Sequence, residues 1–185
     1  MREKIISIIN QKGGVGKTTT VINLAAGLSL KNKKILVIDL DPQGNATTGL
    51  GLSNADQTSN SIYKILTGTK LIEHAISKTK FSNLDMITSN VDLSGLEVET
   101  ADDVRRAYIL KERLATYLNN SSGSYDYVLI DCPPSLNLLT VMALVASHSL
   151  LVPLQTEFFA LEGITQLIKT IDRIKIGLNP DLLIR

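Results

Sequence analysis

Short runs of aliphatic residues recur along the chain without polar residues alternating between them. Runs of this length that are rich in Val, Ile and Leu are typical of strands buried on both faces of a parallel sheet. We therefore expect strands at residues 5–9, 35–38, 127–130 and 150–154, and a further strand within residues 81–88.

The segments between these runs are longer and carry apolar residues at helical spacing. Residues 20–30 place Val21, Leu24, Ala25 and Leu28 on one face, and residues 135–147 repeat this pattern. Further helices are expected at residues 93–118 and 160–176, the latter stopped by Asn179-Pro180. Strands that alternate with helices predict an α/β fold, with a doubly wound, mostly parallel sheet flanked by helices.

The amino-acid composition excludes some classes of protein for this chain. The chain has 185 residues, 44% of them hydrophobic, and a formal net charge of +1. These values fit a single soluble domain over residues 1–185, and they exclude a chain that coats DNA or a membrane by bulk charge. The net charge does not report on a local basic patch, which would have to be identified from the positions of the basic residues. No apolar run approaches the ~18 to 20 residues that span a bilayer, so we expect no membrane partner and a cytoplasmic location.

A glycine-rich segment directly follows the first predicted strand and precedes the first predicted helix. It contains Lys12, Gly13, Gly14, Val15, Gly16, Lys17, Thr18 and Thr19. Its last residues match the P-loop pattern G-x-x-x-x-G-K-[ST], while the first glycine is replaced by Gln11. Backbone N–H groups of such a loop cradle phosphates, Lys17 would contact the β- and γ-phosphates, and Thr18 would offer its hydroxyl to Mg²⁺. The alternative is a turn that only caps a helix.

Acidic residues stand where two of the predicted strands end. Asp39 and Asp41 follow residues 35–38, and Asp131 follows residues 127–130. Any one of these three aspartates, taken alone, fits a turn or helix cap better than a functional site. Carboxylates that lie beside a polyphosphate at the same edge of the sheet repel it unless a divalent cation lies between them. Together with the P-loop, these aspartates therefore predict a magnesium site, with Asp131 as a ligand and Asp39 as a possible second ligand.

These motifs together resemble the deviant Walker A ATPases of the ParA/Soj group, relatives of MinD and of the nitrogenase iron protein. The resemblance rests on residues 12–19, 39–47 and 131–135, with a further match at 155–163. It implies a homodimer that closes over ATP and Mg²⁺, hydrolyses ATP slowly, binds DNA non-specifically as the ATP dimer and responds to a ParB-like partner during chromosome or plasmid partitioning.

The resemblance also implies a role for each matching residue. Lys12 would reach the phosphates of the partner subunit, Lys17 those of its own subunit, and Thr19 would lie near the α-phosphate. Asp41 would orient the attacking water, Asp131 would be the Walker B acid, and Asp39 would assist Mg²⁺ or hold its loop. The expected catalytic residues are therefore Lys12, Lys17 and Asp41.

Other functions remain as alternatives. A MinD-like regulator would need a terminal basic amphipathic helix, for which the last seven residues are too few. A nitrogenase-type reductase needs more than the single Cys132 to bridge a cluster, and a metabolic enzyme could use the same loop. Family members normally continue past the equivalent of Arg185, so the chain is also expected to be a C-terminally truncated fragment. Lys169, Arg173 and Lys175 fit a solvated helix face better than a DNA contact.

Overall fold

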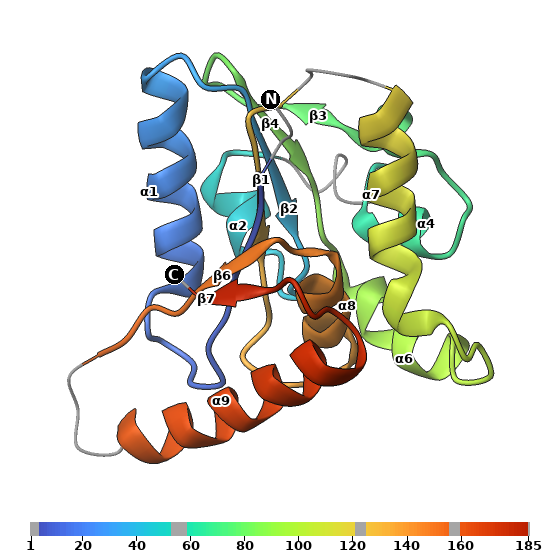
Figure 1. The fold of residues 1–185 in the computed structure, drawn as a ribbon. Helices are drawn as coiled ribbons and strands as arrows, with labels where there is room; N and C mark the ends of the chain where they lie inside the picture. The colour runs from blue at the N-terminus through green and yellow to red at the C-terminus, as the bar shows by residue number, and fades with distance from the viewer. Residues whose placement is uncertain (1–3, 53–58, 121–124, 156–159, 185) are drawn as a thin grey trace.

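A seven-stranded sheet forms the middle of the computed structural model, which describes residues 4–52, 59–120, 125–155 and 160–184 (Figure 1). The strands are arranged in the order β3-β4-β2-β5-β1-β6-β7, and only β3 runs antiparallel to its neighbour. Their bounds are β1 Lys4–Ile8, β2 Ile35–Asp39, β3 Ser77–Lys78, β4 Leu84–Ile87, β5 Tyr127–Asp131, β6 Ser149–Leu151 and β7 Leu183–Ile184. The predicted α/β fold with a mostly parallel sheet is confirmed.

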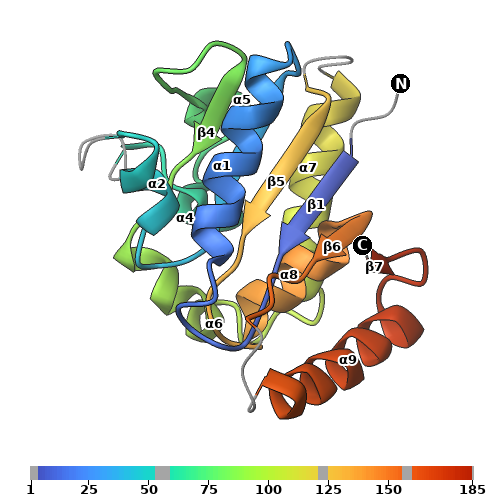
Figure 2. The ribbon, with the colours of Figure 1, turned by 90° about the vertical axis from the view of Figure 1, so that its left-hand side faces the viewer.

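Helices cover both faces of this sheet (Figures 1 and 2). On one face, α1 (Lys17–Leu30) buries Val21 and Ala25 against Ile35 and Val37 of β2. The intervening residues of β2 pack with α7 (Ile109–Asn120) and α8 (Leu138–Ala146) on the other face. Successive side chains of a strand point to opposite faces, so a strand covered on both sides needs an unbroken aliphatic run.

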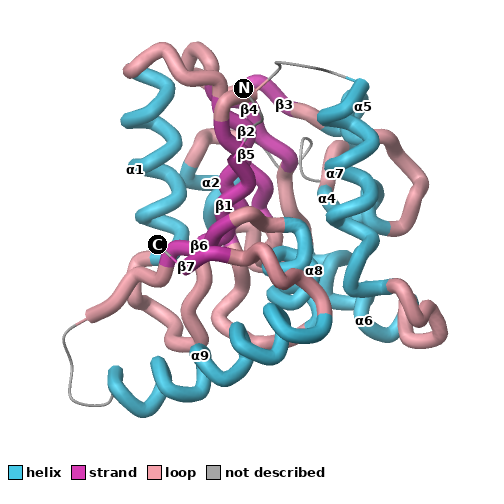
Figure 3. Tube along the Cα trace, in the orientation of Figure 1, coloured by secondary structure: helices cyan, strands magenta, loops and turns pink. Residues whose placement is uncertain are grey.

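Helix α9 (Ala160–Gly177) lies across the end of the sheet below α8, and the tube view separates these helices from the strands (Figure 3). It buries Leu167, Ile171 and Ile174 in the same core cluster as α8. Its end at Gly177 agrees with the predicted stop before Asn179-Pro180. The Asn179 side chain donates hydrogen bonds to Leu144 O and Ser147 O, which fixes this end of α9 to α8.

The prediction of a single helix over residues 93–118 is wrong. This segment forms a 3-10 turn η1 (Val91–Gly95), a short helix α6 (Leu96–Glu99), a second turn η2 (Arg106–Tyr108) and then α7. Between them, the Asp103 carboxylate accepts a hydrogen bond from the backbone N–H of Arg105 at 2.7 Å. Side-chain bonds of this local kind compete with the helical bond pattern and end a helix.

Three short helices were not anticipated by the aliphatic pattern: α2 (Asn45–Gly49), α4 (Ile62–Leu66) and α5 (Ile72–Ala75). Each is too short to display a full apolar stripe. Strand β6 is shorter than predicted, because it stops before Pro153, which lacks the N–H that a ladder needs. Residues 51–60 are polar and rich in Gly, Ser and Asn, which predicts a surface loop, and much of this range falls outside the described residues. Among the described helices, none is both long and apolar enough to span a bilayer.

Candidate functional site

The glycine-rich loop connects the carboxyl end of β1 to the first residue of α1, Lys17. Gly14 and Gly16 have φ angles of +75° and +90°, in the left-handed region that favours glycine. Two side chains brace the loop: Asn10 Oδ1 accepts from Lys12 N at 3.0 Å, and Gln155 Nε2 donates to Gly14 O at 3.1 Å. These contacts hold the loop in its turn, with its backbone N–H groups near the N-terminus of α1.

A cavity of about 400 Å³ opens beside this loop. It brings together the loop, α1, the segment after β2 and the segment after β5, being lined by Gly13, Gly14, Gly16, Lys17, Thr18, Thr19, Asp41, Asn45 and Pro134. Partial positive charge at the helix N-terminus and the flanking lysine favour an anion in this cavity. Two of the predicted loop residues, Lys12 and Val15, line a different cavity, and the Val15 side chain is buried.

Lys17 lines the cavity and is only 7% exposed. Its Nζ donates a hydrogen bond to Lys12 O at 3.1 Å. Burial lowers the pKa of Lys17, while the nearby carboxylates of Asp131 and Asp41 act in the opposite direction. The ammonium group is thus hydrogen-bonded to the loop and lies within the electrostatic influence of two acids, Asp131 at the end of β5 and Asp41 in the segment after β2.

Asp131, the last residue of β5, is fully buried and is paired in register with Asp39 of β2. Neither of its carboxylate oxygens accepts a well-formed hydrogen bond from a described residue. Burial raises its pKa to about 7, and the charges of Asp39 and Asp41 add to this, whereas the Thr18 hydroxyl and Lys17 lower it. A buried carboxylate with so few donors is costly unless a cation accompanies it.

Asp39 differs from Asp131, because both of its carboxylate oxygens accept hydrogen bonds from protein donors. Oδ1 accepts from Asp41 N at 3.1 Å, and Oδ2 accepts from the N–H and the hydroxyl of Thr47 at 2.9 and 2.7 Å. Burial raises its pKa to about 6 even though these bonds act the other way. Asp39 does not line the described cavity, whereas Asp41 does. These contacts favour the loop-holding alternative for Asp39 over the magnesium alternative.

Lys12 lies on the other side of the glycine-rich loop from Lys17. It lines a second cavity of about 250 Å³, together with Asn10, Gln11, Val15, Leu154, Gln155 and Gly163. The two lysines of the loop consequently face two different cavities.

Comparison with known proteins agrees with these features. A family model described as "AAA domain" matches residues 3–184. Chromosome partitioning protein ParA of Caulobacter vibrioides is 50% identical over 179 residues, which cover 97% of this chain and 66% of that protein. Sporulation initiation inhibitor protein Soj of Bacillus subtilis is 47% identical over 181 residues, covering 98% and 70%.

The chain belongs to the ParA/Soj family of P-loop ATPases. It spans about two thirds of the length of these two relatives. Among solved structures, cobyrinic acid a,c-diamide synthase from Mycobacterium smegmatis with bound ADP and magnesium superposes with a TM-score of 0.91 at 37% identity, covering 98% of this chain and 72% of that one. The ParA/Soj fold therefore accounts for nearly the whole chain.

Several residues of this ParA/Soj site were not singled out by motif. Asn45 and Pro134 line the nucleotide-sized cavity, Asn10 and Gln155 brace its loop, and Thr47 connects Asp39 to the N–H of Ser89. Thr47 and Asn45 belong to the segment 39–47 that follows β2, so their nearness to Asp41 in sequence was the available signal. Gln155 belongs to the segment 155–163 that contributes to the resemblance, whereas Ser89 is remote in sequence and carried no signal.

Proposed function

We propose that the chain binds ATP with Mg²⁺ in the 400 Å³ cavity and hydrolyses it, as the nucleotide switch of a chromosome or plasmid partitioning system. The observation that carries the proposal is the grouping of Lys17, Thr18 and Asp41 around one cavity, with the buried Asp131 beside them. Identities of 50% and 47% to ParA and Soj favour partitioning over the synthase reaction named for the 37% identical structure.

The loop and the start of α1 would hold the phosphates. Backbone N–H groups of residues 13–16 and the helix N-terminus supply partial positive charge, and Lys17 supplies a full one at the β- and γ-phosphates. Thr19 also lines the cavity and would contact the α-phosphate. Binding would stabilise the buried Lys17 ammonium, because an anion then replaces the solvent that burial removes.

The surroundings of Asp131 fit a magnesium ion. Among the described residues, no three His, Cys, Asp or Glu side chains are grouped so as to hold a metal by themselves. Thr18 and Asp131 would therefore hold Mg²⁺ jointly with phosphate oxygens, and the bare, buried oxygens of Asp131 are suited to this role. When bound, the ion would supply positive charge for the charge that develops on the transferred phosphoryl group.

Asp41 would position the water that attacks the γ-phosphate. Its side chain lines the cavity, and its Oδ1 accepts from Gln43 N at 3.0 Å, which leaves Oδ2 available for a water. Asp39 would act only through the loop, since its oxygens already bind Asp41 N and Thr47. We therefore assign catalysis to Lys17, Asp41 and Lys12, and positioning to Asp39.

Lys12 would act across a homodimer. It lines a cavity separate from that of Lys17, which supports a role toward the phosphates of a second subunit. Closing the dimer would exclude water and bring a further charge to the developing transition state. Non-specific DNA and a ParB-like protein are the expected partners of this switch.

Phosphate release and particle size test the proposal together. The purified chain with ATP and Mg²⁺ is expected to release phosphate slowly and to form dimers in light scattering, and DNA with a ParB-like peptide is expected to accelerate release. Lys17→Ala is the matched negative control. If the wild-type chain binds ATP but neither turns it over nor dimerises, the alternative of a nucleotide-binding fragment replaces the switch.

A further inference from the structure

Asn10 connects the glycine-rich loop to the segment that follows β6. Its half-buried side-chain amide bonds in two directions: Oδ1 accepts from the backbone N–H of Lys12 at 3.0 Å, and Nδ2 donates to the carbonyl oxygen of Pro153 at 2.8 Å. The donor and the acceptor belong to one planar amide group, so a single side chain sets the distance between Lys12 and Pro153. Lys12 is thereby tied to a segment that is remote in sequence.

This contact begins where the main-chain pairing of β1 with β6 ends. Ile9, one residue beyond the end of β1, donates its N–H to Leu151 O at 3.1 Å. The segment after β6 then reaches Pro153, which has no N–H to donate, so only its carbonyl oxygen can form a hydrogen bond. The Asn10 amide supplies the donor for that oxygen. Its side chain thus continues the connection between the two strands as far as the loop.

Both backbone polar groups of Lys12 are held. Its N–H donates to Asn10 Oδ1, and its carbonyl oxygen accepts from Lys17 Nζ at 3.1 Å. The first bond comes from the side of the β6 segment, and the second comes from a residue that lines the nucleotide cavity. The backbone of Lys12 therefore has a defined place, which fixes the Cα atom from which its side chain extends.

The second cavity is bounded by the same contacts, because Asn10, Lys12 and Gln155 all line it. Gln155 also reaches the loop, where its Nε2 donates to Gly14 O at 3.1 Å. The two amides hold different parts of the loop. Asn10 holds the backbone of Lys12, whereas Gln155 holds Gly14, which lines the nucleotide cavity.

We propose that Asn10 is a positioning residue for Lys12, which it holds in place against the segment after β6. The functional consequence rests on the proposed function, in which Lys12 reaches the phosphates of a second subunit. Placing a long lysine side chain costs conformational entropy, and this cost is smaller when the backbone is already fixed. Asn10 acts through Lys12 and not on the nucleotide, so its loss should weaken the ATP-dependent dimer more than ATP binding.

Three variants separate the positioning of Lys12 from general support of the loop. Asn10→Ala removes both bonds of the amide. Asn10→Asp keeps the size but places an acceptor where the donor to Pro153 O was, so it tests the link to the β6 segment. Gln155→Ala is the matched control, because it also removes an amide bond to the loop, and that bond ends at Gly14.

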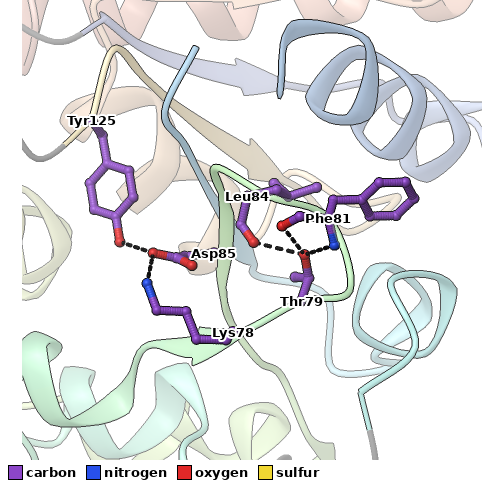
Figure 4. Close-up of polar contacts among 6 residues, drawn as sticks. All are labelled: Lys78, Thr79, Phe81, Leu84, Asp85 and Tyr125. Atoms are coloured by element: carbon purple, nitrogen blue, oxygen red, sulfur yellow. Dashed lines mark hydrogen bonds and ion pairs between the residues drawn. The ribbon is translucent and has the colours of Figure 1, made fainter. Parts of the chain in front are cut away.

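A fourth variant controls for a loss of stability without any contact to the loop. At the amino ends of the parallel strands, Lys78 Nζ and the Tyr125 hydroxyl both donate to Asp85 Oδ2, at 2.7 and 2.8 Å, and Figure 4 shows the two side chains converging on it. These three residues line neither the nucleotide cavity nor the second cavity. Tyr125→Phe removes one bond of this cluster and should lower the urea midpoint while leaving dimerisation within about twofold of the wild type.

Hydrogen exchange of the Lys12 amide, followed by NMR on isotope-labelled protein without nucleotide, measures the positioning directly. In the wild type, Tyr125→Phe and Gln155→Ala, this amide should exchange at least about tenfold more slowly than an unprotected amide, because the bond to Asn10 must open first. Asn10→Ala should lose this protection. An unprotected Lys12 amide in the wild type, or protection that survives in Asn10→Ala, would overturn the proposal.

Isothermal titration of ATP and light scattering with ATP give the functional signature. Asn10→Ala and Asn10→Asp should bind ATP within about threefold of the wild type, and their dimer dissociation constant should rise roughly tenfold. Gln155→Ala should instead raise the Kd for ATP by roughly threefold to tenfold and dimerise normally at saturating ATP. Equal losses of ATP affinity and dimerisation in Asn10→Ala and Gln155→Ala would reduce Asn10 to a general brace of the loop. That result, or wild-type dimerisation by either Asn10 variant, contradicts the proposal.

The proposed function is judged by the wild type alone. A wild-type chain that neither dimerises with ATP nor releases phosphate would reject the switch. In that case the exchange of the Lys12 amide still decides whether Asn10 holds Lys12, because this measurement needs neither nucleotide nor a second subunit.

Discussion

The hydroxyl of Thr47 donates a hydrogen bond of 2.7 Å to Oδ2 of Asp39, and its oxygen accepts from the N–H of Ser89 at 3.1 Å. Thr47 therefore ties the end of β2 to the residues that follow β4. Asp39 also accepts from the N–H of Asp41, so the bond between Thr47 and Asp39 extends to the acid that lines the nucleotide cavity. We infer that Thr47 is a positioning residue for Asp41.

Thr47→Val should lower ATP turnover while leaving the affinity for ATP nearly unchanged. Valine keeps the shape but loses a buried hydrogen bond to a charged group, worth about 1.5 to 3 kcal/mol, so a roughly tenfold to hundredfold fall in kcat is expected. Thr47→Ser restores the hydroxyl and should recover most of the turnover. Steady-state kinetics of the three proteins decide the matter, and an unchanged kcat in Thr47→Val would remove Thr47 from the positioning of Asp41.

Asp131→Asn should stabilise the chain in the absence of nucleotide and metal. The folded-state pKa of about 7 exceeds the ordinary value of 3.8, so the folded state binds more protons than the unfolded state between these values. The contribution of Asp131 to stability is thus complete below about pH 4 and is lost as the pH rises through about 7. Asparagine avoids this loss, which we expect to be about 2 to 4 kcal/mol at pH 8.

Urea unfolding in EDTA, at pH 5 and at pH 8, measures this difference. The gain of Asp131→Asn over the wild type should be larger at pH 8, while its magnesium-dependent ATP turnover should fall by at least about a hundredfold. A variant less stable than the wild type at pH 8 would show that the Asp131 carboxylate is well stabilised without a cation.

Lys12→Ala should separate nucleotide binding from dimerisation. Its side chain lines the second cavity, and Lys17 with the loop N–H groups would still hold the phosphates of the same chain. We expect the variant to retain ATP binding in isothermal titration and to lose the ATP-dependent dimer in light scattering. Lys12→Arg is the charge-preserving control, and an Ala variant that still dimerises with ATP would rule out the role across subunits.

Asp41→Ala should preserve the ATP-bound dimer and abolish hydrolysis. The aspartate contributes one acceptor to Gln43 N and lines the cavity, so its loss removes the group proposed to hold the attacking water. A fall in turnover of about a hundredfold to ten-thousandfold is typical for loss of a general base. Single-turnover phosphate release measures this fall in hydrolysis, and dimer formation with ATP is the internal control. Normal phosphate release by Asp41→Ala would exclude Asp41 from the mechanism.

The amino-acid sequence by itself determined the alternation of strands and helices and the chemistry of the glycine-rich loop. Both depend on residues close together in the chain: aliphatic runs predicted β2 and β5, and the contiguous residues 12–19 specified a phosphate loop. Asp41 and Asp131 were foreseen because parallel strands place their carboxyl ends at one edge. Local pattern failed at residues 93–118, where the Asp103 side chain interrupts a helix that the apolar spacing favoured.

Only the tertiary structure decided which partners the polar side chains take. Asp39 and Asp41 are two residues apart, yet one binds Thr47 and the other lines the cavity. Lys12 and Lys17 flank the same loop and line different cavities. The physical reason is that strand register and crossover connections set these distances, and register is a property of pairs of strands remote in sequence.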